Sequence, residues 1–307
     1  MNYNKSAGHV SLFLTNAIFG INTAVSRSLV PDVVHPLVVA FLRTAGALLL
    51  FWSISFFMKK ERVPKKDLLL MFFASIFAIG LNQTMFIIGL SMTSPIDAAI
   101  EQTFLPILSM FLAACFLKEP ITWKKALGVC IGAVGVLTLI LGHVQTAGSR
   151  SILGNGIIFV GVLSFSLYLT LFKELTGRYS PVTLMKWMFL FSAVPNFLLS
   201  YEALVATDFS AISLDSYLRI GYIVVFATFL AYLLIPVGQK TLRPTTISMY
   251  SYVQPVISAF VSIVIGIEAF GVDKLLSAVL VFTGVFLVTK SKSRAQMEAE
   301  IHQPKSG

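Results

Sequence analysis

Long apolar runs alternate with short polar loops along almost the whole chain. Each run is about 20 residues long, the length a helix needs to cross the hydrocarbon core of a bilayer. The loops leave no room for a separate soluble domain. The pattern predicts an all-α polytopic membrane protein with ten transmembrane helices. The predicted ranges are 9–28, 36–57, 67–90, 95–117, 124–142, 152–173, 182–202, 215–237, 244–266 and 272–290.

The segment 94–140 recurs at 243–289 without a gap. Matched pairs, each 149 positions apart, are Pro95 and Pro244, Pro106 and Pro255, Ser109 and Ser258, Glu119 and Glu268, and Gly135 and Gly284. Apolar bias would align aliphatic residues with one another, but not prolines and a glutamate in one register. We therefore interpret the chain as two copies of a five-helix unit, 1–145 and 146–290, followed by a polar tail, 291–307, that is predicted to be disordered.

Composition supports a membrane environment. The chain is 56% hydrophobic and 12% charged, whereas a soluble domain carries roughly a quarter charged residues. The net charge of +9 comes from basic residues in short loops, so we predict no nucleic-acid partner. The two cysteines, Cys115 and Cys130, lie in apolar runs and are expected to be small buried hydrophobes. No metal-ligand spacing is present, and no cofactor is predicted.

Most of the 23 basic residues lie in every second loop and near the two chain ends. By the positive-inside rule, these loops face the cytoplasm, and both termini are predicted to be cytoplasmic. Because each copy has an odd number of spans, the second copy must be inverted relative to the first. The expected architecture is a 5+5 inverted-topology repeat, which is the architecture used for alternating access.

Two opposite charges are expected at the same depth inside the bilayer. Arg43 lies about seven residues into the second span and Glu101 about six into the fourth. Both spans begin outside, so a rise of ~1.5 Å per residue puts each roughly 10 Å below the outer face. Charged residues within a membrane are costly and usually functional. We expect an ion pair that closes or lines the outward route; the alternative is a buried pair that fixes helix packing.

Uncharged amides and phenols make up the other candidate binding residues. Several hydrogen bonds against an aromatic wall would suit a neutral, zwitterionic or amphipathic solute. The alternative is interhelical hydrogen bonding, worth ~0.6 kcal/mol on average. The set is Asn22, Asn82, Gln83, Gln102, Tyr168, Tyr232, Tyr250, Tyr252 and Gln254.

Proline recurs at matching mid-span positions, Pro106 and Pro255. Because proline removes a backbone donor and kinks a helix, we predict a hinge or a cavity-shaping kink at each, with simple packing as the alternative. Glu119 is expected to cap or pair within its own turn, and Lys186 to extend to the cytoplasmic interface. Glu101 is a better candidate than Glu119 for the residue that carries a coupling proton.

Three stretches carry the motif elements of a known family. They are FGINTAVSR at 19–27, HPLVVAFLRTAGALLL at 35–50 and LPILSMFLAACFLKEPITWKKALGVCIGAVGVLTL at 105–139. The most specific part, a glutamate at the end of the fourth span followed by a Gly-rich fifth span, recurs at 265–284. Over essentially its whole length the chain resembles the drug/metabolite transporter superfamily, in particular its EamA-type exporters. The resemblance implies a bacterial inner-membrane exporter of small metabolites such as amino acids or related compounds.

The features together predict a secondary transporter that works by alternating access. No Gly-rich phosphate loop or Walker motif is present, and the four histidines are isolated. The alternatives are a channel and a non-transport membrane protein, either an intramembrane enzyme or a scaffold. The expected partners are a small-molecule substrate and the lipid bilayer, with a proton as the candidate coupling ion. The expected state is a monomer or a homodimer.

Overall fold

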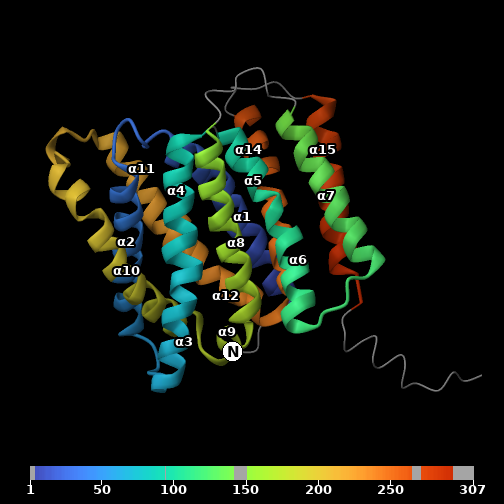
Figure 1. The fold of residues 1–307 in the computed structure, drawn as a ribbon, viewed down its shortest axis with the longest axis horizontal. Helices are drawn as coiled ribbons and strands as arrows, with labels where there is room; N and C mark the ends of the chain where they lie inside the picture. The colour runs from blue at the N-terminus through green and yellow to red at the C-terminus, as the bar shows by residue number, and fades with distance from the viewer. Residues whose placement is uncertain (1–3, 94, 142–150, 265–270, 293–307) are drawn as a thin grey trace, which may run out of the picture.

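The computed structural model describes residues 4–93, 95–141, 151–264 and 271–292, and within these ranges the chain has no strand (Figure 1). The first half contains α1 (Lys5–Arg27), α2 (Pro36–Ser55), α3 (Lys65–Ser75), η1 (Ile76–Leu81), α4 (Asn82–Met92), α5 (Pro95–Gln102), α6 (Phe104–Leu117) and α7 (Trp123–Leu141). The second half contains α8 (Ile152–Leu171), α9 (Lys173–Arg178), α10 (Pro181–Ala206), η3 (Phe209–Ala211), α11 (Leu214–Val224), η4 (Val225–Leu230), α12 (Ala231–Thr241), α13 (Pro244–Met249), η5 (Tyr250–Tyr252), α14 (Val253–Val264) and α15 (Val272–Thr289). The predicted all-helical architecture is confirmed.

Polar caps fix where several of these helices begin. The side chains of Asn4, Ser151 and Ser180 each accept a hydrogen bond from the backbone N–H three residues further on, at 2.7, 3.1 and 3.2 Å. Each bond satisfies a donor that the first helical turn leaves without an intrahelical partner. Helices α2 and α10 both begin with proline, which is favourable there because the missing N–H would have no helical acceptor.

The boundaries of α3, η1 and α4 recur residue for residue in α11, η4 and α12. The first series starts at Lys65 and the second at Leu214, 149 positions later, and both contain a π-helical segment of six residues at the same place. π-Helical turns are rare, so their recurrence is not a by-product of apolar composition. The duplication therefore extends further towards the N-terminus than the segment in which the sequence revealed it.

The matching helices α7 and α15 pack against each other in opposite directions (Figure 1). Gly128, early in α7, lies beside Gly284, late in α15, while Gly135, later in α7, lies beside Ser277, early in α15. A Cβ atom on Gly284 would lie 2.5 Å from the carbonyl oxygen of Gly128, so the small residues allow the two backbones to approach. Because Gly128 matches Ser277 and Gly135 matches Gly284, each contact is the copy of the other.

Helices α2 and α10, which match with an offset of 145 from their first residues, show the same relation. Asn196 donates a hydrogen bond to Thr44 at 2.8 Å. The equivalents of these two residues, Phe51 and Phe189, stack with their ring centroids 5.4 Å apart. Self-complementary contacts of this kind arise about a two-fold axis. The contacts of α4 with α8 and of α12 with α1 are a further pair of copies.

Apolar side chains cover much of the outside of the helix assembly. Among the residues that the structure describes, six helical stretches are long and apolar enough to cross a membrane, and large side chains such as Leu49, Leu198 and Val205 are exposed along them. A soluble protein rarely exposes so much contiguous apolar surface. The chain is therefore an integral, polytopic membrane protein. Cys115 and Cys130 are exposed, so the expectation that they are buried is wrong.

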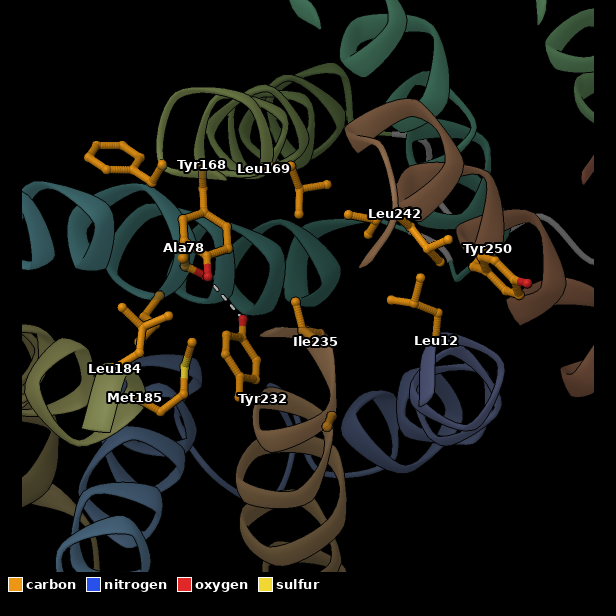
Figure 2. Packing of buried hydrophobic residues seen from close by; sticks show 14 of the residues in the cluster. Leu12, Ala78, Tyr168, Leu169, Leu184, Met185, Tyr232, Ile235, Leu242 and Tyr250 are labelled. Carbon is orange, nitrogen blue, oxygen red and sulfur yellow. Dashed lines mark hydrogen bonds between the residues drawn. The ribbon is translucent and has the colours of Figure 1, made fainter. Parts of the chain in front are cut away.

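The two ends of the assembly differ in the residues that close them. We define the basic end by the loops 56–64, 118–122 and 172–180, and the opposite end by the loops 28–35 and 207–213; they lie at the bottom and the top of Figure 1. The largest hydrophobic core reaches into the basic-end loops. Figure 2 shows Tyr168, Tyr232 and Tyr250 packed with aliphatic side chains in this core. Two smaller clusters lie towards the opposite end.

Candidate functional site

A cavity of about 90 Å³ lies between the two halves. Since roughly 10–15 Å³ accommodates one water molecule, the cavity has room for several waters or for part of a small solute. It is bounded by residues from the middle turns of helices in both copies. The lining residues are Leu12, Thr15, Asn16, Phe19, Asn22, Thr23, Arg43, Asn82, Gln83, Phe86, Gln102, Leu105, Phe165, Leu169, Tyr232, Ile235, Ile247, Ser248, Ser251 and Gln254.

Equivalent positions of the two copies meet in this lining. The pairs that match with the offset of 149 are Gln83 and Tyr232, Phe86 and Ile235, Gln102 and Ser251, and Leu105 and Gln254. Phe19 and Phe165, which match in the first span of each copy, also lie there. The cavity therefore lies where the two copies face each other, and its two sides have the same geometry but different chemistry.

Arg43 is the only charged residue among the described residues that line the cavity. Its side chain is buried, and its Nε donates a hydrogen bond to the hydroxyl of Thr228 at 3.0 Å. Thr228 in turn donates to the carbonyl of Ile223 at 2.8 Å, five residues earlier, which is the spacing of the π-helical segment η4. The π-turn thus positions a hydroxyl of the second half against an arginine of the first.

The predicted ion pair between Arg43 and Glu101 is not formed. Within the described part of the chain no salt bridge joins the two. Glu101 is half-buried outside the cavity lining, and the carboxylate of Asp97 is near enough to repel it. Helix α2 packs against α10, α4, α11 and η4, so Arg43 points to the second half. Helical rise predicts only how far along its span a residue lies, and it does not determine the direction in which a side chain leaves its helix.

The amides around the cavity differ in how they are satisfied. Gln254 donates to the Oδ1 of Asn16 at 2.7 Å, and Asn82 donates to the carbonyl of Gly161 at 3.0 Å. Gln83 is buried, with neither its Nε2 nor its Oε1 within hydrogen-bond geometry of a protein atom, although it lies near the Tyr232 phenol. A buried amide without partners costs about 1–3 kcal/mol, so this side chain is suited to a ligand.

The predicted tyrosines divide between the cavity and the core. Tyr232 lines the cavity while its hydroxyl donates to the carbonyl of Ala78 at 3.0 Å, the bond drawn in Figure 2. The other three lie outside the lining, and each hydroxyl is bonded. Tyr168 donates to Gln239 at 3.0 Å, Tyr250 pairs with His9 at 2.7 Å, and Tyr252 donates to the carbonyl of Thr103 at 3.0 Å.

Both predicted proline kinks coincide with breaks in the helices. The helical stretch 95–117 is interrupted at Thr103, between α5 and α6, three residues before Pro106. The stretch formed by α13 and α14 is interrupted by the 3₁₀ turn η5, which ends three residues before Pro255. Thr103 and Tyr252 are equivalent residues, and the hydrogen bond between them joins the two breaks directly. Whether the breaks act as hinges stays a prediction.

Polar residues of α1 that the sequence reasoning missed also line the cavity. Thr15, Asn16 and Thr23 lie there, together with the expected Asn22. They share one face of the helix with Leu12 and Phe19, at spacings of three and four residues. This spacing was visible in the sequence and could have identified them. Ser248 and Ser251 were missed because single serines are common in helices and carry no comparable signal.

Ion pairs and hydrogen bonds join the helices at the basic end. Lys118 ends α6 in the left-handed conformation, with φ of 51°. The turn lets Glu119 contact the buried ammonium of Lys125 at 3.1 Å and the partly exposed ammonium of Lys173 at 4.0 Å. The prediction that Glu119 pairs at its turn is confirmed, whereas its equivalent, Glu268, lies outside the described residues. Lys186 lies over the Trp52 ring, 5.2 Å from its centroid, rather than in the cavity.

A second group of contacts at the basic end joins α3 to the loop before α10. Asp67 accepts hydrogen bonds from Arg178, at 3.2 Å, and from the hydroxyl of Tyr179. Burial and the bond to Asp67 raise the pKa of Tyr179 to about 12. Glu61 accepts bonds from the N–H and hydroxyl of Ser180. Burial opposes ionisation of Glu61, but the interactions with Thr183 and Ser180 and the nearby charge of Lys240 outweigh it and hold its pKa below the usual value.

Comparison with known proteins agrees with this architecture. The model of the EamA-like transporter family matches the chain twice, over residues 6–141 and 152–290. An uncharacterized transporter, YyaM, of Bacillus subtilis is 28% identical, over 74% of each chain. An uncharacterized transporter of Archaeoglobus fulgidus is 24% identical, over 92% of this chain and 99% of its own.

Similarity extends to plants and to a solved structure. The WAT1-related protein At2g37460 of Arabidopsis thaliana is 25% identical over 87% of this chain and 80% of its own. A protein of known crystal structure superposes with a TM-score of 0.77 over 97% of this chain and 99% of its own, at 15% identity, which shows a common fold. Because the family model covers both halves, the chain belongs to the EamA-like transporter family.

Proposed function

We propose that the protein is a secondary transporter of small metabolites that works by alternating access, with ten membrane spans arranged as a 5+5 inverted repeat. The observation that carries the proposal is the central cavity, lined by equivalent residues of two copies whose matching helices run antiparallel. In an inverted repeat of this kind, the substrate site lies between the copies and can be opened to either side by related movements.

The basic end faces the cytoplasm in this proposal. Its loops hold Lys59, Lys60, Arg62, Lys118, Lys173 and Arg178, whereas the loops 28–35 and 207–213 of the opposite end hold no lysine or arginine. By the positive-inside rule the basic end is cytoplasmic, and so are both termini. The conformation described here is closed towards the cytoplasm, because the largest core and the ion pairs of Glu119 and Asp67 lie on that side of the cavity.

Transport direction and membrane are proposed from the family. The named relatives are transporters, and the resemblance to EamA-type exporters favours export of amino acids or related amphipathic compounds across the bacterial inner membrane. Glu101 is half-buried near the opposite end, and we propose it as the carrier of a coupling proton. The protein would act as a monomer or as a homodimer.

Reconstitution into proteoliposomes tests the proposal. Radiolabelled amino acids, aromatic ones first because phenylalanines line the cavity, would be offered with and without the same unlabelled compound inside. A carrier gives saturable uptake that the internal compound stimulates. Uptake that rises linearly with concentration and ignores the internal compound would indicate a channel, and no uptake of any amino acid would contradict the proposed substrate group.

A further inference from the structure

We propose that the cavity binds a small solute through a carboxylate group held by Arg43, with the Gln83 amide as a second contact. The inference rests on the proposed function and names the chemical class of the substrate.

The charge of the cavity is the first reason. Arg43 is 3% exposed, and none of the described carboxylates forms a salt bridge with it. Burying an ammonium or guanidinium group costs several kcal/mol unless an anion compensates. The described lining offers amides, hydroxyls and aromatic rings but no carboxylate. A solute carrying a carboxylate would supply the missing charge, whereas a cation would be repelled by Arg43 and would find no carboxylate in the described lining.

The second reason is that the fold does not need an arginine at this place. The residue of α10 equivalent to Arg43 is Met188, and the residue of η1 equivalent to Thr228 is Ile79. Met188 and Ile79 are both fully buried. The same two positions are therefore filled by an apolar pair in one copy and by a charged, hydrogen-bonded pair in the other. Packing alone would be served by the apolar pair.

The third reason is the way in which the guanidinium is held. Thr228 orients Arg43 through the Nε atom, which leaves the two terminal nitrogens available for the paired contacts that carboxylates favour. Gln83, on the same lining, has an unpaired amide that can donate to the same group or to a neighbouring acceptor. Phe19, Phe86 and Phe165 provide an apolar surface for the remainder of the solute.

Three probes of similar size test the proposal by binding to the full-length protein in lipid nanodiscs. They are phenylacetate, phenylacetamide and phenethylamine, which present an anion, a neutral amide and a cation on one ring. Hydrogen bonds to charged groups contribute about 1.5–3 kcal/mol, so phenylacetate should bind roughly 10- to 100-fold more tightly than phenylacetamide. Equal affinity for the two, or failure of phenylacetate to bind, would overturn the proposal.

Variants assign the preference to the arginine. Arg43→Gln should abolish the preference for phenylacetate, and Arg43→Lys should restore part of it because the charge returns without the planar fork. Thr228→Val should weaken phenylacetate binding and Thr228→Ser should not, since Thr228 is a positioning residue. Arg219→Gln is the matched control, because Arg219 pairs with Asp215 on the surface at 2.6 Å. An unchanged preference in folded Arg43→Gln protein would contradict the proposal.

Failure of this inference is distinguishable from failure of the transport proposal. Counterflow of an amino acid together with no preference for phenylacetate would leave the transporter standing and remove the role of Arg43. Arg43-dependent binding of phenylacetate without counterflow of any carboxylate would support the role of Arg43 and contradict the transport proposal.

Discussion

Equivalent positions of the two copies carry polar side chains towards the opposite end and aromatic ones towards the basic end. Thr44 and Asn196 form a hydrogen-bonded pair where their copies, Phe189 and Phe51, form a ring stack. Asn22, Gln83, Glu101 and Thr103 of the first copy correspond to Tyr168, Tyr232, Tyr250 and Tyr252 of the second. One backbone geometry thus supports a polar half and a packed, closed half.

The difference shows which features belong to the fold and which to the site. What the copies share, such as the paired glycines of α7 and α15 and the two π-turns, is required for the copies to fit together. What they do not share, above all Arg43 with Thr228, is not required for packing, since Met188 and Ile79 take the same places.

The largest effect is expected where both copies need a small residue. In Gly284→Val, the new Cβ would lie 2.5 Å from a backbone oxygen of α7, and a backbone atom cannot move away as a flexible side chain can. We expect little or no folded protein by size-exclusion chromatography. Gly156→Ala is the control, because nothing lies within 4 Å of a Cβ there. Normal yield of Gly284→Val would show that the close approach is dispensable.

Exchanging the residues at the Arg43 position should affect stability in one copy and ligand binding in the other. Met188→Arg places an unpaired charge in the closed half and should destabilise the protein by about 3–5 kcal/mol. Arg43→Met should leave stability nearly unchanged while removing carboxylate-dependent binding. Thermal unfolding in detergent with binding in nanodiscs measures both. A large loss of stability in Arg43→Met would mean that the arginine serves packing.

A smaller effect is expected at the polar pair between α2 and α10. Asn196→Leu leaves the buried hydroxyl of Thr84 without its acceptor and removes the bond that Thr44 accepts, while Thr44 still donates to the carbonyl of Ala40. An unsatisfied buried group costs about 1–3 kcal/mol. Adding Thr44→Val should recover part of the loss, because replacing both partners by apolar groups is nearly neutral. Denaturation of the single and double variants measures the coupling. Strict additivity would contradict the interaction.

The smallest effect concerns pH at the basic end. The pKa of Tyr179 is raised to about 12 by burial and by Asp67, from the ordinary value near 10. A raised pKa means that the folded state holds the proton more tightly. This stabilisation is present below pH 10 and is lost as the pH rises towards 12. Tyr179→Phe should flatten the stability profile in that window, and an identical profile in the variant would contradict the contact.

The lowered pKa of Glu61 acts in the opposite direction. Its stabilisation is present above the ordinary carboxyl pKa and is lost as the pH falls through the folded-state value. Glu61→Gln should therefore reduce the acid sensitivity of the basic end, measured as protease cleavage of the 172–180 loop against pH. Unchanged acid sensitivity would contradict a role for the Ser180 contact.

The sequence predicted the long helical stretches well, because the length of an apolar run and the position of a proline can be read directly along the chain. The range 95–117 coincides with the outer bounds of α5 and α6, and 36–57 differs from α2 by two residues at one end. The constant offset predicted the copies, and the odd number of spans predicted that they oppose each other.

What the sequence left out depends on rotation about the helix axis. The π-turn η4 sets where Thr228 points, and it has no residue signature; Arg43 therefore met Thr228 rather than Glu101. Tyr168, Tyr250 and Tyr252 were placed with the amides by depth, yet they lie outside the cavity lining because they face the core. The residues that line the cavity come from different copies, and the periodicity along a single helix carries no information on which of them meet.

The most direct test of the central claim is the sidedness of Trp123 and Val272. These are equivalent first residues of α7 and α15, and each is 79% exposed. Trp123→Cys and Val272→Cys would be made separately with Cys115 and Cys130 replaced by serine, and labelled with a membrane-impermeant maleimide in intact cells and in inverted vesicles. The inverted repeat predicts labelling of Val272→Cys in cells and of Trp123→Cys only in inverted vesicles. Labelling of both from the same side would contradict it.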